Sequence, residues 1–460
     1  MINQRLTEQL LGIPISHGAD FTELFWELTR SGGITLLSGQ IDSITDNTVT
    51  GVGLRAFKGT STVYGSTSDL SESGLLSLAK SVAEAIGDSG EGVSIHLVPR
   101  TVEDRHPVRI DPHTTDVKER CDLLKLAGES ARAYDSRIVQ AAGNLISVDH
   151  AIAVANSEGL FVTDRHVRTR MSIEAVANDG NETQSGRCSP GRGMGLEVFE
   201  LFTPESIGKK AAEQAITNLK ADYCPAGVMT VAIENGFGGV IFHEACGHSL
   251  EATSVGIGMS EMCGKLGKTV ANPKVTAIDD GTIKGAWGSV NIDDEGNSTN
   301  RNVLIENGVL KKYMIDRLGS RRLGMPMTGN SRRESYLYEP TSRMTNTFID
   351  NGPDKNEDII ASIEYGLYAK SMGGGSVNPL TGAFNFAVTE GYIVRNGKIC
   401  EPVRGASLVG TGAEILMDID MVGQNLDVGQ GMCGSSSGSV PTDVGQPLIR
   451  VSKITVGGRK

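Results

Sequence analysis

The sequence predicts an α+β protein, with an N-terminal α/β domain at residues 1–222 and a β-dominated C-terminal domain at residues 223–460. Length is the first reason, because 460 residues exceed what one hydrophobic core usually serves. The pattern also changes near residue 222: helical periods and strand alternation precede it, and strand and turn signals dominate after it. Finally, 58 glycines without a repeating period indicate many turns and bulges.

In the first part of the chain, the sequence predicts a strand followed by a helix. Apolar residues at 52–56 occupy every second position, as in a half-buried strand. A helix follows, capped by Asp69 or Ser71, with apolar residues at helical spacing as far as Ile86. Residues 93–97 then form a short candidate strand.

The rest of the first domain continues this mixed pattern. Thr114 or Thr115 opens a second helix, and residues 167–175 alternate as a strand after a turn at 156–159. The clearest helix spans residues 203–219, with a threonine at its N-cap and a proline at its first position. A proline and a glycine soon after it place the domain boundary near residue 222.

In the second domain, turn signals separate short strands. Residues 228–233 form a strand that leads into a histidine-containing segment. Asn-Gly pairs at 307–308 and 396–397 each lie between two apolar runs, which predicts type I′ hairpins. One helix, carrying two histidines, interrupts this β-rich region.

Charge and cysteine usage limit the possible partners and compartments. A net charge of −12 and a pI near 5.3, without a dense basic run, argue against nucleic acid as a partner. Seven scattered cysteines without a CxxC pair are typical of a reducing compartment. The N-terminus lacks an apolar signal-peptide region and the chain lacks an 18-residue apolar run, so we expect a soluble cytoplasmic protein without a membrane partner.

The segment His243-Glu244-Ala245-Cys246-Gly247-His248 contains the residue types of a zinc hydrolase site. In such sites the histidines bind the metal, and the glutamate handles the proton of the attacking water. The usual spacing places the histidines four residues apart, whereas His243 and His248 are five apart. Positions five apart differ by about 140° around a regular helix, too far for one tetrahedral ion. Either the segment widens into a π-type turn, or the helix is already ending at His248.

A helix with two buried, satisfied histidines is the simpler interpretation of this segment. A concentration of histidines favours a site, because His243 and His248 are the only histidines after His166. Catalytic zinc usually takes three protein ligands, so one ligand is still needed. The candidates from sequence are carboxylates and cysteines: Glu251, Asp279, Asp280, Cys246, Cys263, Cys400 and Cys433. From the residue types alone, Cys433, which lies in a glycine-dense stretch, and a carboxylate are equally favoured as the third ligand.

The histidine segment, taken together with Gly-Met-Cys-Gly at 431–434, resembles the TldD/PmbA family of metallopeptidases. The same resemblance extends to residues 279–281, 293–296, 328–333 and 343–347. It is dense from about residue 225 to the end and weaker before that. The family has two subunit types, and only the TldD type carries the H-E-x-x-x-H segment. The chain therefore resembles the catalytic type.

The resemblance implies zinc held by His243, His248 and Cys433, with Glu244 as the catalytic carboxylate. It also implies proteolysis of small or unfolded polypeptides, and assembly with a PmbA-type partner into a hollow heterodimer. A homodimer stays open as an alternative.

Such a ligand set has a chemical consequence for the neighbouring glutamate. Two neutral imidazoles and a thiolate leave a net charge near +1 on Zn²⁺, which makes it a milder Lewis acid than one held by three histidines. Glu244 is then needed as general base, and it passes the proton to the leaving amine. Arg332, Arg333 and Tyr336 are candidates for stabilising the oxyanion, and surface charge and core packing are their simpler interpretation.

Residues 373–386 are rich in glycine and form either a strand edge that pairs with an extended peptide or a plain bulge or loop. Two rival functions stay open. One is a non-catalytic interaction or regulatory protein with a structural zinc or none, and the other is a zinc amidohydrolase that acts on a small molecule. An intact Glu244 argues against the first, because a structural site needs no proton acceptor.

Overall fold

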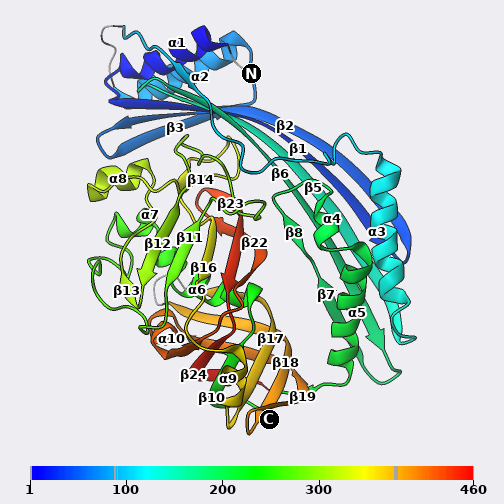
Figure 1. Cartoon of the computed structure of the whole chain (residues 1–460). Coiled ribbons are helices and arrows are strands. Elements are labelled where there is room, and N and C mark those ends of the chain that lie inside the picture. The colour runs from blue at the N-terminus through cyan, green and yellow to red at the C-terminus, as the bar shows by residue number, and fades with distance from the viewer. Residues whose placement is uncertain (1–2, 88–89, 91, 378–381, 459–460) are drawn as a thin grey trace.

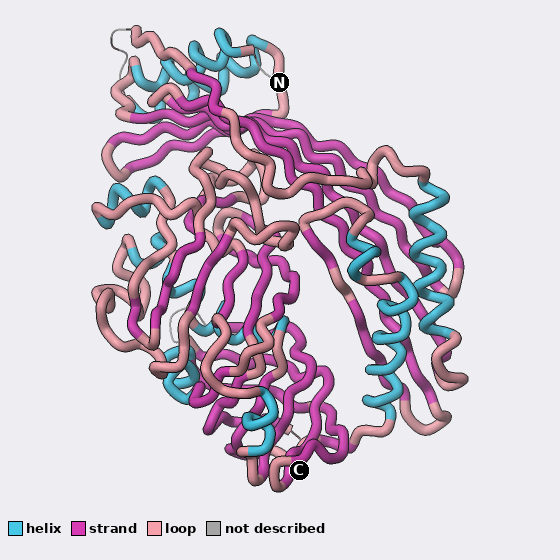
Figure 2. The backbone as a smooth tube through the Cα atoms, viewed as in Figure 1, coloured by secondary structure: helices cyan, strands magenta, loops and turns pink. Residues whose placement is uncertain are grey.

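The computed structural model describes residues 3–87, 90, 92–377 and 382–458. The protein is α+β, as predicted, with strands throughout and helices gathered mainly around the N-terminal sheet (Figure 2). The N-terminal half is one long, curved sheet in the order β3-β2-β1-β5-β6-β4, with β7 and β8 paired to β6. Its strands are β1 (Phe21–Leu37), β2 (Gln40–Lys58), β3 (Ser61–Thr67), β4 (Val98–Arg100), β5 (Ile138–Asn156), β6 (Leu160–Asn178), β7 (Thr183–Cys188) and β8 (Gly191–Arg192).

Helices pack against both ends of this sheet (Figure 1). Helices α1 (Gln4–Ile15) and α2 (Glu72–Ile86) bury one apolar cluster with the sheet. Helices α3 (Val117–Arg132) and α5 (Pro204–Leu219) bury a second cluster with its far end, beside the short α4 (Val198–Leu201). The strands are long because β1, β2, β5 and β6 stay in antiparallel register over most of their length.

The C-terminal half contains a closed ring of five strands. β10 (Gly227–Ile233), β17 (Tyr365–Val377), β18 (Ala383–Arg395), β20 (Ala406–Thr411) and β24 (Ile449–Gly457) pair in a cycle. Three short strands extend it: β9 (Asp222–Tyr223), β19 (Lys398–Arg404) and β21 (Ile419–Val422). Closure leaves fewer free edges in this part of the molecule.

A second C-terminal sheet has the order β13-β12-β11-β16-β23-β22, so that β22 is an edge strand. Its members are β11 (Ala277–Asp280), β12 (Arg301–Glu306), β13 (Val309–Leu310), β16 (Asn346–Ile349), β22 (Asp427–Ser435) and β23 (Gly438–Gln446); β14 (Ser331–Arg332) and β15 (Thr341–Ser342) pair separately. The remaining helices are η1 (Gly236–Gly239), α6 (Val240–Ala245), η2 (Gly247–Leu250), α7 (Ala252–Val255), α8 (Arg317–Leu323), α9 (Asn356–Ala361) and α10 (Gly412–Asp418). One apolar core joins α6 to the ring and to this sheet.

Buried charges connect the two halves. Arg55 of β2 lies between Glu23 of β1 and Glu295 of the C-terminal half, and Arg333 donates to the same Glu23 at 3.0 Å. All four side chains are almost fully buried. Burial raises the pKa of Glu23, and the charges of Arg55 and Arg333 oppose that rise. Each charge therefore depends on the others for its compensation.

Most of the predicted elements are present, and two differ in position. Residues 93–97 do not form a strand: the strand is β4 (Val98–Arg100), because its partner is the parallel start of β6 at Leu160. Helix α3 begins at Val117 rather than after a threonine, since the Asp116 carboxylate accepts the N–H of Lys118 and caps it. We propose residue 222 as the division between the halves, because α5 ends just before it and β9 there pairs with β19.

Within the described residues, no helix combines the length and the apolar character needed to cross a lipid bilayer.

Candidate metal centre

The helix that carries the first histidine ends before it reaches the second. Helix α6 stops at Ala245, Cys246 leaves helical geometry with φ −135° and ψ −38°, and the 3-10 turn η2 begins at Gly247. Of the two alternatives for the five-residue spacing, the ending helix is the one found. The break turns His248 back toward His243, and their ring centroids are 5.1 Å apart.

Packing requires a glycine at this break. A Cβ atom on Gly247 would lie 2.3 Å from the sulfur of Met344, which is fully buried. Any side chain here would displace either Met344 or the turn that carries His248. The glycine therefore fixes the relative position of the two histidines.

Three donor atoms converge from segments that are far apart in the sequence. Cys433 lies on the edge strand β22, and its Sγ is 3.2 Å from Nε2 of His243 and 3.4 Å from Nε2 of His248. The three ligand atoms all lie within 4.8 Å of one another. Tetrahedral zinc with ordinary Zn–N and Zn–S bonds separates such donors by about 3.5 Å. The donor set therefore fits one zinc ion.

The electrostatics of the cluster favour a thiolate. Burial by itself would raise the pKa of Cys433, but the charge and hydrogen bonds of His243 and His248 lower it to about 4. Burial likewise opposes charge on His248, yet Glu251 and Cys433 raise its pKa well above the usual value. The deprotonated sulfur, which is the form that binds metals, is therefore the stable form at neutral pH.

A second layer of residues holds these donors in place. The Oε2 atom of Glu251 is 3.2 Å from Nδ1 of His248, so it orients the ring with Nε2 toward Cys433. Arg343 is fully buried, and its guanidinium donates to the backbone carbonyl of Cys433, to Ser437 Oγ and to the carbonyl of Gly438. Strand β22 is thus fixed at the residue that supplies the sulfur.

Glu244 lies on the wall of a cavity that opens beside the donors. The cavity has a volume of about 500 Å³, and its wall includes His248, Glu251, Gly434 and Ser435. The carboxylate of Glu244 is about one quarter exposed, with Oε2 3.9 Å from Nε2 of His248. A carboxylate in this position can take a proton from a water molecule next to the donors.

The other ligand candidates have different environments. Glu251 contacts the far nitrogen of His248, and Asp279 is committed to Asn330, Thr345 and Thr347. Asp280 accepts hydrogen bonds from Thr282. Cys246 is buried in the apolar core, Cys263 lies near the carbonyl of Val255, and Cys400 is exposed. Among the described residues, the cluster of possible ligands contains Cys433 and the two histidines.

The three candidates for the oxyanion lie elsewhere. Arg332 donates to the carbonyls of Met344 and Pro441 and lines a different cavity. Arg333 belongs to the buried charge network, and Tyr336 packs in a small apolar cluster. Arg343, which the sequence interpretation gave no role, is the arginine next to Cys433. Its signal in the sequence is that residues 343–347 are among the segments that carry the family resemblance.

The glycine-rich residues 373–377 and 382–386 belong to the hairpin of β17 and β18, which is irregular at Ser371, Met372 and Gly375. Residues 378–381, between them, lie outside the described residues. Val377 and Gly382 border the Glu244 cavity, so the hairpin reaches the site.

Three family profiles match along the chain. The PmbA/TldA metallopeptidase domain 1 matches residues 22–86, the central domain residues 110–219 and the C-terminal domain residues 226–458. The chain belongs to the TldD/PmbA metallopeptidase family. It is similar to the metalloprotease TldD homologue of Haemophilus influenzae, at 36% identity over 98% of this chain and 96% of that protein.

The chain is also similar to more distant relatives, and it shares its fold with two solved structures. A metalloprotease of Methanothermobacter thermautotrophicus is 31% identical over 96% of this chain and 97% of its own length. A zinc metalloprotease TldD homologue of Saccharolobus solfataricus is 32% identical over 63% of this chain and 64% of its own length. The crystal structure of TldE from Thermococcus kodakarensis, 18% identical, shares the fold with a TM-score of 0.78 and covers 98% of this chain and 100% of that one. A Thermotoga maritima structure, 24% identical, does so with a TM-score of 0.81 over 99% and 100% of the two chains.

Proposed function

We propose that this chain is a zinc-dependent peptidase that hydrolyses peptide bonds of small or unfolded polypeptides. The observation that carries the proposal is the cavity beside His243, His248 and Cys433, with Glu244 on its wall. Structural zinc sites are closed by four protein ligands, whereas catalytic sites combine three with an open position. A non-catalytic protein with a structural zinc has no use for this opening.

Each residue of the site has its own role in the proposed reaction. His243, His248 and Cys433 would hold zinc, which supplies Lewis-acid polarisation of the scissile carbonyl when bound. Glu244 takes the proton of the attacking water and gives it to the leaving amine. Glu251 keeps His248 in the tautomer whose Nε2 is free to bind, and Arg343 holds the Cys433 backbone.

Replacement of Glu244 by Gln tests this assignment. The variant should keep the fold and the zinc content, because the side chain changes only at one atom and Glu244 is not a ligand. Peptide cleavage should fall by about 10² or more, the scale of losing a general base. Turnover close to that of the unchanged protein, in a zinc-loaded preparation with its partner present, would refute the peptidase mechanism.

We also propose that the substrate enters as an extended chain. The Glu244 cavity borders the edge strand β22 at Gly434 and Ser435, so a substrate backbone can pair there with little dependence on its side chains. A small domain should then be cleaved in a destabilised mutant form and survive in its stable form, with the scissile region unchanged. Equal rates for the two forms would contradict entry as an unfolded chain. A substrate-size profile separates this activity from that of a zinc amidohydrolase that acts on small molecules.

The proposal also includes the oligomeric state and the cellular compartment of the protein. We infer a dimer, either with a PmbA-type paralogue or with a second copy, because a TldE structure shares the fold over nearly the whole chain. A cytoplasmic location agrees with seven free cysteines. Co-purification from the native host, followed by metal quantification, tests the partner and the zinc together.

A further inference from the structure

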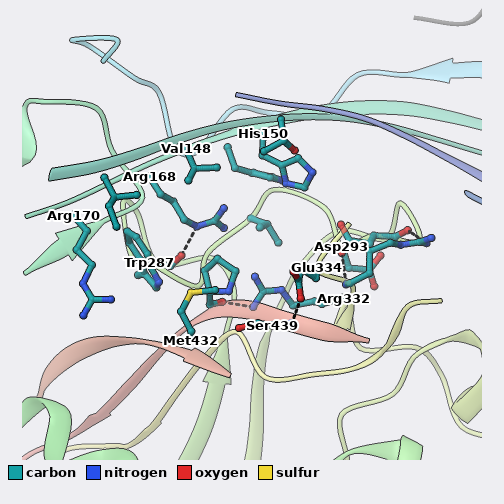
Figure 3. Close-up of a pocket in the computed structure, with 17 residues that line it drawn as sticks. Val148, His150, Arg168, Arg170, Trp287, Asp293, Arg332, Glu334, Met432 and Ser439 are labelled. Carbon is teal, nitrogen blue, oxygen red and sulfur yellow. Dashed lines mark hydrogen bonds between the residues drawn. The ribbon is translucent and has the colours of Figure 1, made fainter. Parts of the chain in front are cut away.

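A second cavity lies between the N-terminal sheet and the hairpin of β22 and β23 (Figure 3). Met432 and Pro441 face each other across this hairpin and both line the cavity. Neighbouring residues of a strand point to opposite faces, so Cys433 faces the histidines while Met432 faces this cavity. The volume of about 370 Å³ suits a small ligand. The two cavities therefore lie on opposite faces of one hairpin.

One wall of the cavity is formed by residues of the long sheet, including two arginines and two histidines. Three successive cross-strand pairs of β5 and β6 face it, since residues two apart share a face; they are Ile146 with Arg170, Val148 with Arg168, and His150 with His166. Figure 3 shows Arg168 and Arg170 on the same side of the sheet, with Arg168 extending over Trp287. The alternation of side chains along β6 is enough to predict that Arg168 and Arg170 share one face of the sheet. Only the tertiary structure shows that the C-terminal half lies against that face.

Arg168 is buried, and among the described residues no acidic side chain pairs with it directly. Its side chain is 5% exposed, Nε donates to the carbonyl of Trp287 at 2.7 Å, and Nη2 lies 3.4 Å from the carbonyl of Ser289. Among the described residues, no carboxylate oxygen lies within the 4.0 Å of an ion pair with it. Burial, together with the charge of Arg332, lowers the pKa of Arg168 to about 9.

Arg332 reaches the same cavity from the opposite side. It is 4% exposed, and Nη1 donates to the carbonyls of Met344 at 2.9 Å and Pro441 at 2.6 Å. It too has no carboxylate partner at ion-pair distance in the part of the chain that the structure describes. Burial lowers its pKa to about 10. Two guanidinium groups thus share a cavity without a direct ion pair, and the buried carboxylates that act on them, chiefly that of Asp294, do so from beyond ion-pair distance.

The acidic residues that line the cavity do not pair directly with Arg168 or Arg332, and each accepts a hydrogen bond from a backbone amide instead. Asp293 accepts the N–H of Ser331 at 3.2 Å. Asp294 accepts the N–H of Arg333 at 2.7 Å, and Glu334 accepts that of Ser439 at 2.7 Å. A buried charge without a partner is costly, so a bound anion would stabilise this arrangement.

The cavity also has an apolar part, which consists of Ile146, Val148, Trp287, Val290, Met432 and Pro441. An oxyanion on an apolar body matches both parts of the cavity, and carboxylates accept paired hydrogen bonds from arginine. We propose that this cavity binds a small ligand through a carboxylate held between Arg168 and Arg332, with an apolar body against Trp287 and Met432. A free small acid and the C-terminal residue of a peptide share this chemistry. The proposal stands independently of the peptidase activity.

Isothermal titration calorimetry of the full chain with N-acetyl-L-leucine tests the site. The acid should bind, and N-acetyl-L-leucinamide, which lacks the charge, should bind at least tenfold more weakly. Arg168→Gln should weaken binding about 10- to 100-fold, the effect of losing charged hydrogen bonds. Arg395→Gln is the matched control, because Arg395 is exposed at the end of β18 and pairs with Glu401, and neither residue lines the cavity. It should leave the affinity unchanged.

A second variant keeps the proposal testable if Arg168→Gln fails to fold. Val148→Glu places a carboxylate directly across from Arg168, where it occupies the guanidinium in place of the ligand. It should abolish binding and leave the fold intact. A peptide ending in free leucine distinguishes the two sources: binding as tight as that of the small acid identifies a peptide end, and no binding identifies a free acid.

Three results would overturn the proposal. Undetectable binding of N-acetyl-L-leucine to the unchanged protein is the first. Unchanged affinity in Arg168→Gln and Val148→Glu is the second, since it would locate the acid at the metal donors instead. Equal affinity for inorganic phosphate is the third, because it would show that the apolar body contributes nothing.

Discussion

Replacing Arg55 by Met tests the buried charge network between the two halves. Arg55 is 1% exposed, lies 3.3 Å from Glu23 and also pairs with the fully buried Glu295. Methionine fills much of the space but leaves both carboxylates without this cation. Removing one partner of a buried pair costs about 3–5 kcal/mol in the free energy of unfolding. For a domain of this size that corresponds to a fall in Tm of about 6–20 °C.

The exposed pair of Arg109 and Glu200 supplies the matched control. Their side chains are 61% and 60% exposed, and solvent screening leaves such pairs with little effect on stability. Arg109→Met should therefore change the Tm by only a few degrees. Calorimetric or fluorescence-monitored melting of both variants, beside the unchanged protein, measures the contrast.

The effect of Arg55→Met should also depend on pH. Burial already raises the pKa of Glu23, and the loss of Arg55 removes a charge that opposes this rise. A carboxyl group with a raised pKa binds its proton more tightly in the folded state, so stability falls as pH rises from the unfolded pKa through the folded one. The deficit relative to the unchanged protein should be larger at pH 8 than at pH 5.5. Equal losses in the Arg55 and Arg109 variants, or a deficit independent of pH, would refute the reasoning.

Three further predictions concern the metal centre. Cys433→Ser should lower zinc occupancy and activity, while Cys263→Ser and Cys400→Ser should not; full zinc retention in the first variant would move the third ligand to Glu251 or another carboxylate. Glu251→Gln should weaken zinc binding about 10- to 100-fold by releasing His248, as metal-competition titration would measure, and unchanged affinity would contradict an orienting role. The ultraviolet thiolate absorbance of metal-free protein, compared with Cys433→Ser, should persist as pH falls and disappear only near pH 4. A midpoint near the ordinary value of about 8.5 would contradict the assigned environment.

The sequence by itself determined the local features of the backbone, such as turns and helix ends. The Asn-Gly pairs at 307–308 and 396–397 form the predicted hairpin turns, with positive φ at all four residues, because that conformation depends on these residues alone. Helix α5 begins after its threonine cap for the same reason. The spacing of His243 and His248 likewise restricted their segment to two conformations, and the ending helix is the one that formed.

Contacts between distant segments were decided only by the tertiary structure. His243 and Cys433 are 190 positions apart, and their 3.2 Å approach depends on where β22 pairs in its sheet. From the residues alone Cys433 and a carboxylate were equally good ligands, and the family resemblance was needed to choose between them. Neither the pairing of Glu251 with His248 nor the contact of Arg343 with Cys433 has a signal in local spacing. Such contacts arise when separate elements pack into one core, and the periodicity of each element says which face it buries but not which element will cover that face.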